Sequence, residues 1–152
     1  MTNHIIAEAT LTDLNAITHL LTVLFTQEAD FEPQPEKQMH AVSDILRHPD
    51  KGHFLLIKHQ SKVVGVVSLL YLTSTAMGGK VALLEDMVID EQHRGKGFGS
   101  ALLNAAVNFA RQQGCLRMTL LTDADNAIAQ KMYQDEGFTH SAMIPMRLIL
   151  DT

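Results

Sequence analysis

Cysteine is almost absent from this chain of 152 residues, and Cys115 is its only example. A single cysteine excludes a disulfide within the chain and suits a reducing compartment. Cys115 stands at the start of an expected strand, where a buried structural thiol is a simpler explanation than a nucleophile. The sequence therefore predicts a cytoplasmic protein whose stability comes from a hydrophobic core.

Long apolar runs are also missing. No stretch approaches the roughly 20 residues that a membrane-spanning helix needs. The first residues lack the basic flank and apolar segment of a secretory signal, so none is expected. Hydrophobic residues make up 46% of the chain and charged residues 19%, as in ordinary soluble domains. We expect one domain over residues 1–152 and no membrane partner.

An excess of positive charge is lacking as well. The net charge is -5, whereas nucleic-acid-binding proteins are normally basic. The chain has eight histidines, but none forms His-x-His or His-x-x-x-His, and no cysteine pair accompanies them. The sequence thus argues against a nucleic-acid partner and against a metal site.

Glycines at alternate positions, Gly95, Gly97 and Gly99, form the most distinctive stretch that is present. Residues 81–89 before them are apolar and rich in β-branched side chains, which predicts a strand. The apolar spacing after Gly99 predicts a helix. A strand-to-helix junction directs unpaired backbone N–H groups at one point, where the helix dipole adds positive potential. The stretch therefore predicts an anion site, usually for a phosphate.

The spacing of the glycines discriminates between phosphate ligands. The Walker pattern is absent, and the dinucleotide pattern fails because its last glycine would fall on Ser100 or Leu102. The motif that fits is Gln92-x-x-Gly95-x-Gly97. It resembles the pyrophosphate loop, Gln/Arg-x-x-Gly-x-Gly/Ala, of the GNAT family of N-acetyltransferases. A glycine-rich turn without a ligand is the alternative for this motif taken alone.

The resemblance implies that acetyl-CoA is the cosubstrate and that no metal takes part. In that family the strand equivalent to residues 81–89 splays from the next one, here residues 116–122. Pantetheine inserts into the gap, and a backbone N–H near Val88 polarises the thioester carbonyl. The residues expected to bind the cofactor are Met87, Val88, Ile89, Arg94, Gly95, Lys96, Gly97, Phe98, Gly99, Ser100, Asn126 and Ala129.

A second stretch, Asn126-x-x-Ala129-x-x-x-Tyr133, followed by Gly137-Phe138, also resembles the family. The resemblance implies a short helix beside pantetheine, with Tyr133 protonating the thiolate that leaves. A phenol has a pKa near 10 and a thiol one near 8.5, so this transfer depends on positioning. The alternative is a structural tyrosine packed on the sheet.

Glu85 and Asp86 are adjacent acids in the mostly apolar stretch of residues 81–89. Neighbours in a regular strand point to opposite faces, so one of them can face a cleft. A primary amine is almost fully protonated at neutral pH, and a carboxylate near the thioester could accept its proton. We favour Glu85 as this base, and a purely structural carboxylate is the alternative.

The expected elements follow the order β-α-α-β-β-β-α-β-α-β. This order combines antiparallel hairpins with one β-α-β crossover, and it predicts an α/β (α+β) fold with a mixed, mostly antiparallel central sheet flanked by helices. It is similar to the GNAT acyl-CoA N-acyltransferase fold. The expected strands are residues 4–9, 54–58, 63–72, 81–89, 116–122 and one or two in 141–150. Three helices are expected to begin at Thr10-x-x-Asp13, at about Pro35 and after Gly99. A fourth helix is expected over residues 127–136.

The function implied is transfer of the acetyl group of acetyl-CoA to a primary amine by direct attack in a ternary complex. A non-catalytic acyl-CoA-binding sensor or regulatory module on the same fold is the alternative, although it would need neither Tyr133 nor Glu85. The acceptor, a small molecule or a peptide, is not identified. Residues 27–35 carry Glu28, Asp30 and Glu32 without a basic residue, which suits a cationic acceptor; a solvated acidic loop is the alternative. The resemblance also implies a homodimer.

Overall fold

The first unit of the chain is built on a five-stranded sheet in the order β1-β2-β3-β4-β5. The computed structural model describes residues 3–27 and 34–150, which divide into two compact units, Met1–Leu121 and Thr122–Thr152. All neighbouring strands are antiparallel except the parallel pair β4 and β5. The strands are β1 (His4–Glu8), β2 (Gly52–His59), β3 (Lys62–Ser74), β4 (Gly79–Ile89) and β5 (Met118–Leu120).

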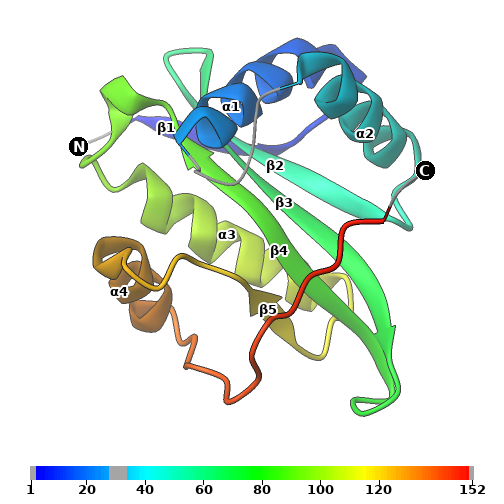
Figure 1. The fold of residues 1–152 in the computed structure, drawn as a ribbon. Helices are drawn as coiled ribbons and strands as arrows, with labels where there is room; N and C mark the ends of the chain where they lie inside the picture. The colour runs from blue at the N-terminus through cyan, green and yellow to red at the C-terminus, as the bar shows by residue number, and fades with distance from the viewer. Residues whose placement is uncertain (1–2, 28–33, 151–152) are drawn as a thin grey trace. The chain divides into compact units, whose positions relative to one another are not determined.

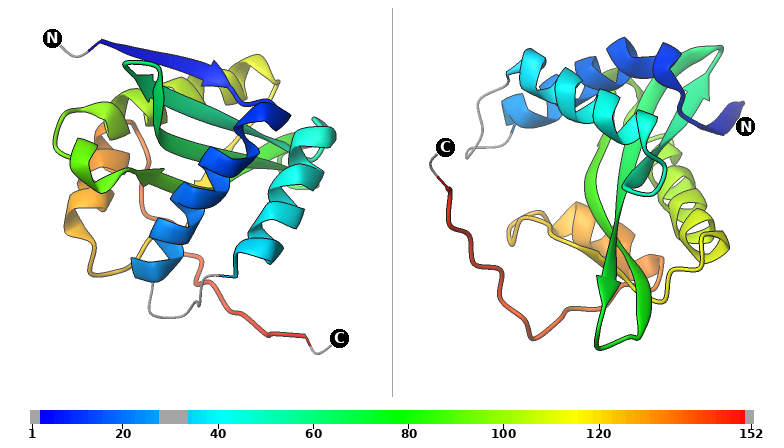
Figure 2. Two further views of the ribbon diagram at one scale, coloured as in Figure 1. Left: turned by 90° about the horizontal axis from the view of Figure 1, so that it is seen from above. Right: turned by 90° about the vertical axis from the view of Figure 1, so that its right-hand side faces the viewer.

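Helices cover both faces of this sheet. Helices α1 and α2 lie on one face and α3 lies on the other (Figure 1, Figure 2). The second unit contains one helix, α4, among its described residues. The helices are α1 (Leu14–Gln27), α2 (Pro35–Arg47), α3 (Phe98–Gln112) and α4 (Ala127–Asp135), with short 3-10 turns η1 (Leu11–Asp13) and η2 (Glu91–His93). The predicted mixed, mostly antiparallel sheet flanked by helices is confirmed.

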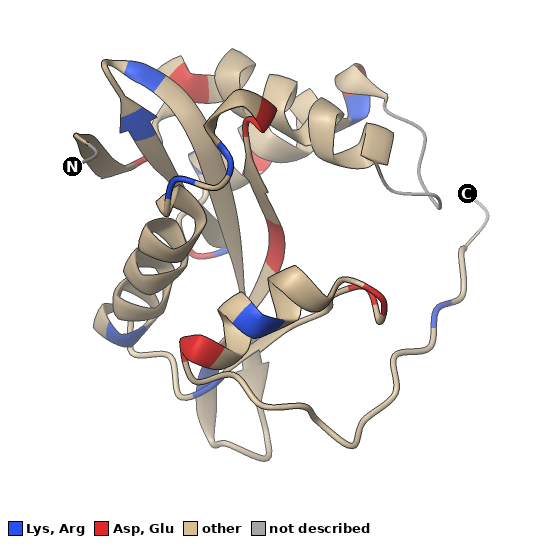
Figure 3. Cartoon of the chain, turned by 90° about the vertical axis from the view of Figure 1, so that its left-hand side faces the viewer, with Lys and Arg blue, Asp and Glu red and all other residues tan. Residues whose placement is uncertain are grey.

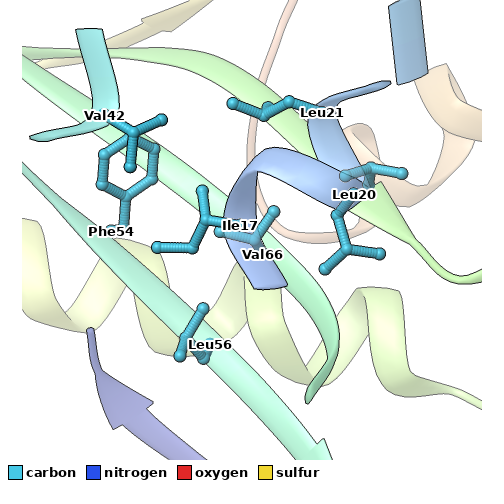
Figure 4. Packing of buried hydrophobic residues seen from close by; sticks show 8 residues of the cluster. Ile17, Leu20, Leu21, Val42, Phe54, Leu56 and Val66 are labelled. Carbon is cyan, nitrogen blue, oxygen red and sulfur yellow. The ribbon is translucent and has the colours of Figure 1, made fainter. Parts of the chain in front are cut away.

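The core between α1, α2 and the sheet follows the predicted apolar stripes. Ile17 and Leu21 of α1 and Val42 of α2 are buried against Phe54 and Val66 of the sheet (Figure 4). The predicted capping motif is present at the start, since Asp13 Oδ2 accepts a hydrogen bond from the Thr10 N–H at 2.9 Å. The helix it introduces starts with the 3-10 turn η1 before the regular helix α1.

The hairpin between β3 and β4 is longer than predicted. Residues 73–80 were expected to form a loop, but Thr73 pairs with Lys80 and Ser74 with Gly79, so the expected loop is wrong at both ends. The connection needs only residues 75–78, because Gly78 takes a φ of 77° that closes the turn. Strands β3 and β4 extend for as long as their backbone groups can form hydrogen bonds with each other.

The expected strands in residues 141–150 are wrong, because the structure has no strand there (Figure 1). Apolar β-formers predict a strand, but a strand exists only where its backbone groups pair with a neighbour. Residues 141–150 join none of the described strand pairs, and Pro145 has no N–H to offer. The expected strand over residues 116–122 is also too long, since β5 covers only Met118–Leu120.

Gly65 in β3 lies opposite Ile89 at the end of β4. A Cβ at Gly65 would fall 2.5 Å from Ile89 Cδ1 and 2.7 Å from Ile57 Cγ2, which is too close for either side chain to remain in place. The missing side chain therefore lets β2, β3 and β4 pack together where β4 leaves the sheet.

Candidate functional site

The connection from β4 to α3 places two glycines in the left-handed region. Gly95 has a φ of 75°, and Gly97, the N-cap of α3, has a φ of 84°. Glycine is required there because a Cβ is strained in that conformation. A Cβ added at either position would meet no heavy atom within 4 Å. The loop therefore presents bare backbone to open space, as an anion-binding turn should.

The start of α3 supplies donors at the same place. The helix begins at Phe98, slightly before the position expected from the sequence, so Gly99 and Ser100 belong to its first turn. Backbone N–H groups in a first helical turn have no intrahelical acceptor, and the helix dipole makes this end positive. Lys96 is exposed beside them, and Figure 3 shows basic residues on the turn before α3. The predicted strand–glycine–helix junction is present with the polarity that an anion needs.

Phe98 anchors the helix start through its side chain. Only 1% of Phe98 is exposed, and its ring contacts the rings of His4, His59 and His93, with centroid distances of 5.4 to 6.2 Å. Only the backbone of Phe98 is therefore available to a ligand. The buried ring holds the first turn of α3 against the sheet.

The side chain of Arg94 bonds to protein acceptors. Its Nε donates to the carbonyl oxygen of Ile89 at 2.9 Å, and its Nη2 donates to Gln27 Oε1 at 3.3 Å. These bonds tie the glycine loop to the end of β4 and to α1. The sequence motif contains Arg94 but shows nothing of this arrangement.

Asp90 and His93 brace the turn before the glycines, and sequence reasoning missed them. His93 Nδ1 lies 2.8 Å from Asp90 Oδ2, and the Asp90 N–H donates to the carbonyl of Val64 at 2.7 Å. The hydrogen bond from His93 lowers the pKa of Asp90. The spacing Asp-x-x-His was the signal that could have found this pair.

The pairing of β4 with β5 stops short of this loop. β5 pairs only with residues 82–84 of β4, and β3 covers the other edge as far as Ile89. Within the part of the chain that the structure describes, no strand pairs with residues 85–89 on the β5 side. The pairing of β5 with β4 thus ends at Leu84, and the splay that the resemblance implies stays a prediction. Met87, Val88 and Ile89 lie beyond this last pair.

A β-bulge interrupts β4 at Glu85 and Asp86. The register passes from Val67 opposite Met87 to Leu69 opposite Leu84, so two residues of β4 face Ser68. Ser68 is 2% exposed, and its hydroxyl accepts a hydrogen bond from the Asp86 N–H at 2.9 Å. The regular alternation of faces assumed from the sequence is therefore wrong here. Glu85 is exposed and Asp86 is half-buried.

The second unit positions the other predicted residues around α4. The Asn126 side chain caps this helix by accepting a hydrogen bond from the Ala129 N–H at 3.2 Å, which explains the spacing of the two residues. Tyr133 lies in the last turn, with its ring 6.0 Å from that of Phe138. Burial raises the pKa of Tyr133. Their roles toward a cofactor or substrate remain predictions.

The described residues offer neither a cluster of metal ligands nor a membrane-spanning helix. Residues 3–27 and 34–150 contain no group of three His, Cys, Asp or Glu side chains that could hold a metal ion. In the same residues no helix has the length and apolar character to cross a membrane. The acidic residues Glu28, Asp30 and Glu32 lie outside the described residues.

Comparisons with known proteins agree on one family. The model of the acetyltransferase (GNAT) family matches residues 14–138. N-acetyltransferase family 8 member 2 of Rattus norvegicus is 33% identical over 87 residues, which are 57% of this chain but only 38% of that protein. The chain thus matches less than half the length of that curated relative.

Solved structures share the fold over the whole chain. The structure of "a possible acetyltransferase from Clostridium difficile 630" has a TM-score of 0.87 at 20% identity and covers 98% of this chain and 99% of that one. Aminoglycoside N-acetyltransferase AAC(6')-Iy in complex with CoA has a TM-score of 0.80 at 18% identity, with coverage of 98% and 96%. At these identities the likeness establishes the fold alone.

Proposed function

The chain belongs to the acetyltransferase (GNAT) family, and from this we propose that it transfers the acetyl group of acetyl-CoA to a primary amine by direct attack in a ternary complex. The family match runs across the boundary between the two units, which supports one catalytic domain over residues 1–152. A cytoplasmic location and a homodimer belong to the same proposal.

The observation that carries the proposal is the open glycine junction that follows the part of β4 beyond its pairing with β5. Gly95 and Gly97 leave bare backbone in front of the positive end of α3, which suits the pyrophosphate of CoA. Met87 and Val88 pair with β3 on one side and lie beyond the last pair with β5, which suits the amide groups of pantetheine. In this arrangement Met87, Val88 and Ile89 bind the pantetheine of CoA, and residues 94–100 bind its pyrophosphate.

The chemical step needs a base and an acid. The ammonium of the acceptor gives a proton to Glu85, directly or through water, and the free amine attacks the thioester carbon. The tetrahedral intermediate collapses with cleavage of the carbon–sulfur bond, and Tyr133 protonates the departing thiolate while the new amide nitrogen loses its extra proton to solvent. Burial raises the pKa of Tyr133 from its usual 10, so the phenol is protonated at neutral pH, as a donor must be.

The acceptor in this proposal carries positive charge. Its support is the acidic composition of residues 27–35 and the net charge of -5. Acidic side chains attract cations and repel carboxylated or phosphorylated amines. The acceptor is therefore an amine with a further cationic group, either a small molecule or a basic peptide.

Two variants with matched backbone strain test the cofactor site. Gly97→Val and Gly114→Val place the same side chain at the two ends of α3, where φ is 84° and 83° and a Cβ meets no atom within 4 Å. Both should lose similar stability, but only Gly97→Val should weaken CoA binding, by roughly tenfold or more in calorimetry. Equal CoA affinity in the two variants would remove the phosphate site from this loop.

Release of free CoA with a panel of amines then separates an enzyme from a sensor. The wild-type chain should release thiol from acetyl-CoA with at least one cationic amine. Tight CoA binding without thiol release for any amine would favour the non-catalytic acyl-CoA-binding module.

A further inference from the structure

A groove of about 260 Å³ lies between β1 and α3, within the first unit of the chain. Its lining on α3 consists of residues three and four positions apart, which share one face of a helix: Ala105, Asn108, Phe109 and Gln112. Because Ala105 has only a methyl group as its side chain, the helix leaves the space beside it open. About 18 Å of helix separates Gly97 from Phe109, so the groove is distinct from the glycine junction.

The opposite wall of the groove comes from the edge of the sheet. Ile6 and Glu8 are alternate residues of β1 and point to the same face. Leu55 of β2 pairs with Glu8 and is 3% exposed. The apolar side chains of both walls form the floor, and the exposed side chains around it are polar. A water molecule takes about 30 Å³ of liquid volume, so the groove has room for roughly nine heavy atoms.

Glu8 gives the groove a negative charge. Its side chain is 55% exposed, and the other polar side chains of the lining, Asn108 and Gln112, are neutral amides. Among the described residues that line the groove, none is a lysine, arginine or histidine. Arg111 is not part of the lining, and its Nη1 donates to Asn108 Oδ1 at 3.2 Å. A carboxylate beside an apolar floor suits a ligand that is both cationic and apolar.

His53 holds the Glu8 carboxylate in place. His53 Nε2 lies 3.2 Å from Glu8 Oε1, and Nδ1 lies 2.6 Å from the Tyr71 hydroxyl. A carboxylate only accepts hydrogen bonds, so Nε2 carries the hydrogen and Nδ1 accepts from Tyr71. Burial lowers the pKa of His53, so its ring is neutral at neutral pH and leaves the charge of Glu8 uncompensated. His53 engages Oε1, and Oε2 can accept from a ligand.

We propose that this groove binds a small amine with an apolar body, whose ammonium group pairs with Glu8 and whose hydrocarbon part lies on Ile6, Leu55 and Phe109. Burial of the hydrocarbon drives binding, and the carboxylate selects a cation over a neutral or acidic molecule of the same shape. The glycine junction lies at the other end of α3, so the amine bound here is not the one that is acetylated in the proposed reaction. The groove is a second, non-catalytic site, and it does not depend on the chain being an enzyme.

Titration with 2-phenylethylamine, followed by NMR of the backbone amides, tests the site. The amides of Glu8, Leu55 and Ala105 should shift and saturate, with a dissociation constant of roughly 0.1 to 1 mM, as expected for a ligand this small. The amides of Gly95 and Gly97 should stay in place. The control ligand 2-phenylethanol has a similar shape and no charge, and it should bind roughly tenfold more weakly or worse.

Two variants test the charge and the floor separately. Glu8→Gln keeps an oxygen that accepts from His53 and removes the charge, so the affinity for 2-phenylethylamine should fall roughly tenfold or more. Ala105→Leu fills the open space and should also weaken binding. The matched control, Glu36→Gln, neutralises an exposed acid of α2 and should bind like the wild type. The dispersion of each NMR spectrum shows whether the variant is folded.

Several results would contradict the amine site. They are the absence of saturable shifts at millimolar amine, shifts confined to β4 and the glycine loop, equal affinity for 2-phenylethylamine and 2-phenylethanol, and full affinity in Glu8→Gln. The measurement reports binding and not acetyl transfer. A chain without acetyltransferase activity would therefore still show the amine in this groove, and an active enzyme would not.

Discussion

Among single residues, Tyr133 carries the most specific chemical expectation. Its phenol is half-buried, and burial raises its pKa, so it is protonated and costly to ionise. Tyr133→Phe removes the proton but keeps the ring that packs beside Phe138. The kcat should fall by roughly 10²–10⁴ under conditions where chemistry limits the rate. CoA affinity should stay unchanged; a wild-type kcat would leave Tyr133 with a packing role only.

Glu85 is the exposed acid of the β4 bulge, and its proposed task is to take the proton of the amine. Glu85→Gln preserves shape and removes the base, so the acidic limb of the pH profile of kcat/KM should shift or vanish. The matched control is Glu36→Gln, which neutralises an exposed acid in the first turn of α2. If both variants keep the wild-type profile, the proton leaves by another route, through Asp86 or ordered water.

His53 gives the molecule a predictable response to acid. Its side chain is 10% exposed, with Nδ1 2.6 Å from the Tyr71 hydroxyl and Nε2 3.2 Å from Glu8 Oε1. Burial lowers the pKa of His53 from its usual 6.5, although Glu8 opposes this. Below pH 6.5 His53 is therefore protonated in the unfolded chain but still neutral in the folded chain. The free energy of unfolding should fall as the pH drops from 6.5 toward the folded pKa.

The test compares melting temperatures near neutral pH and near pH 5.5. His53→Gln retains a partner for Tyr71 and removes the titration, so its melting temperature should fall less on acidification than that of the wild type. His140→Gln, at an exposed position, should behave like the wild type. An identical loss in all three proteins would place the acid sensitivity elsewhere.

At the scale of elements, α4 depends on its cap. Asn126→Ala removes the side chain that accepts from the Ala129 N–H and should cost about 1 kcal/mol of stability. Asn126→Ser keeps a capping oxygen and should lose much less. Hydrogen exchange of the α4 amides measures both effects. If the serine variant also binds CoA normally and the alanine variant does not, Asn126 supports cofactor binding by capping α4 and not by contacting the cofactor.

Elements with local causes were predictable from the sequence, and those set by distant pairing were not. The stripe Ile17, Leu21 and Val42, the cap at Thr10 and the end of α3 at Gly114 each depend on residues close in sequence. The length of β5 and the state of residues 141–150 depend on whether a partner strand is present, which apolar spacing does not encode. For the same reason the bulge at Glu85 came only from the structure, whereas the strand–glycine–helix order that follows it was predictable from the residues.

At the scale of the whole molecule, the net charge of -5 bears on the choice of acceptor. Replacing Glu28, Asp30 and Glu32 with their amides should lower kcat/KM for a cationic amine more than for a neutral one. The difference should shrink at high salt, because exposed charges are screened beyond about 8–10 Å. Steady-state kinetics at two ionic strengths measures this. Equal losses for both amines, or no dependence on salt, would leave the acidic segment without a part in selection.

The absent side chain of Gly65 restricts which sequences this fold can tolerate. Even the smallest replacement, alanine, would push Ile89 or Ile57 away, and Ile89 holds Arg94 through its carbonyl. A substitution at Gly65 would thus disturb the position of Arg94 in the glycine loop, although Gly65 does not contact that loop. In a library of random variants selected for acetyl transfer, position 65 should return glycine almost alone, although it touches no substrate. A glycine selected there would reflect the packing of the sheet and not a part in the reaction.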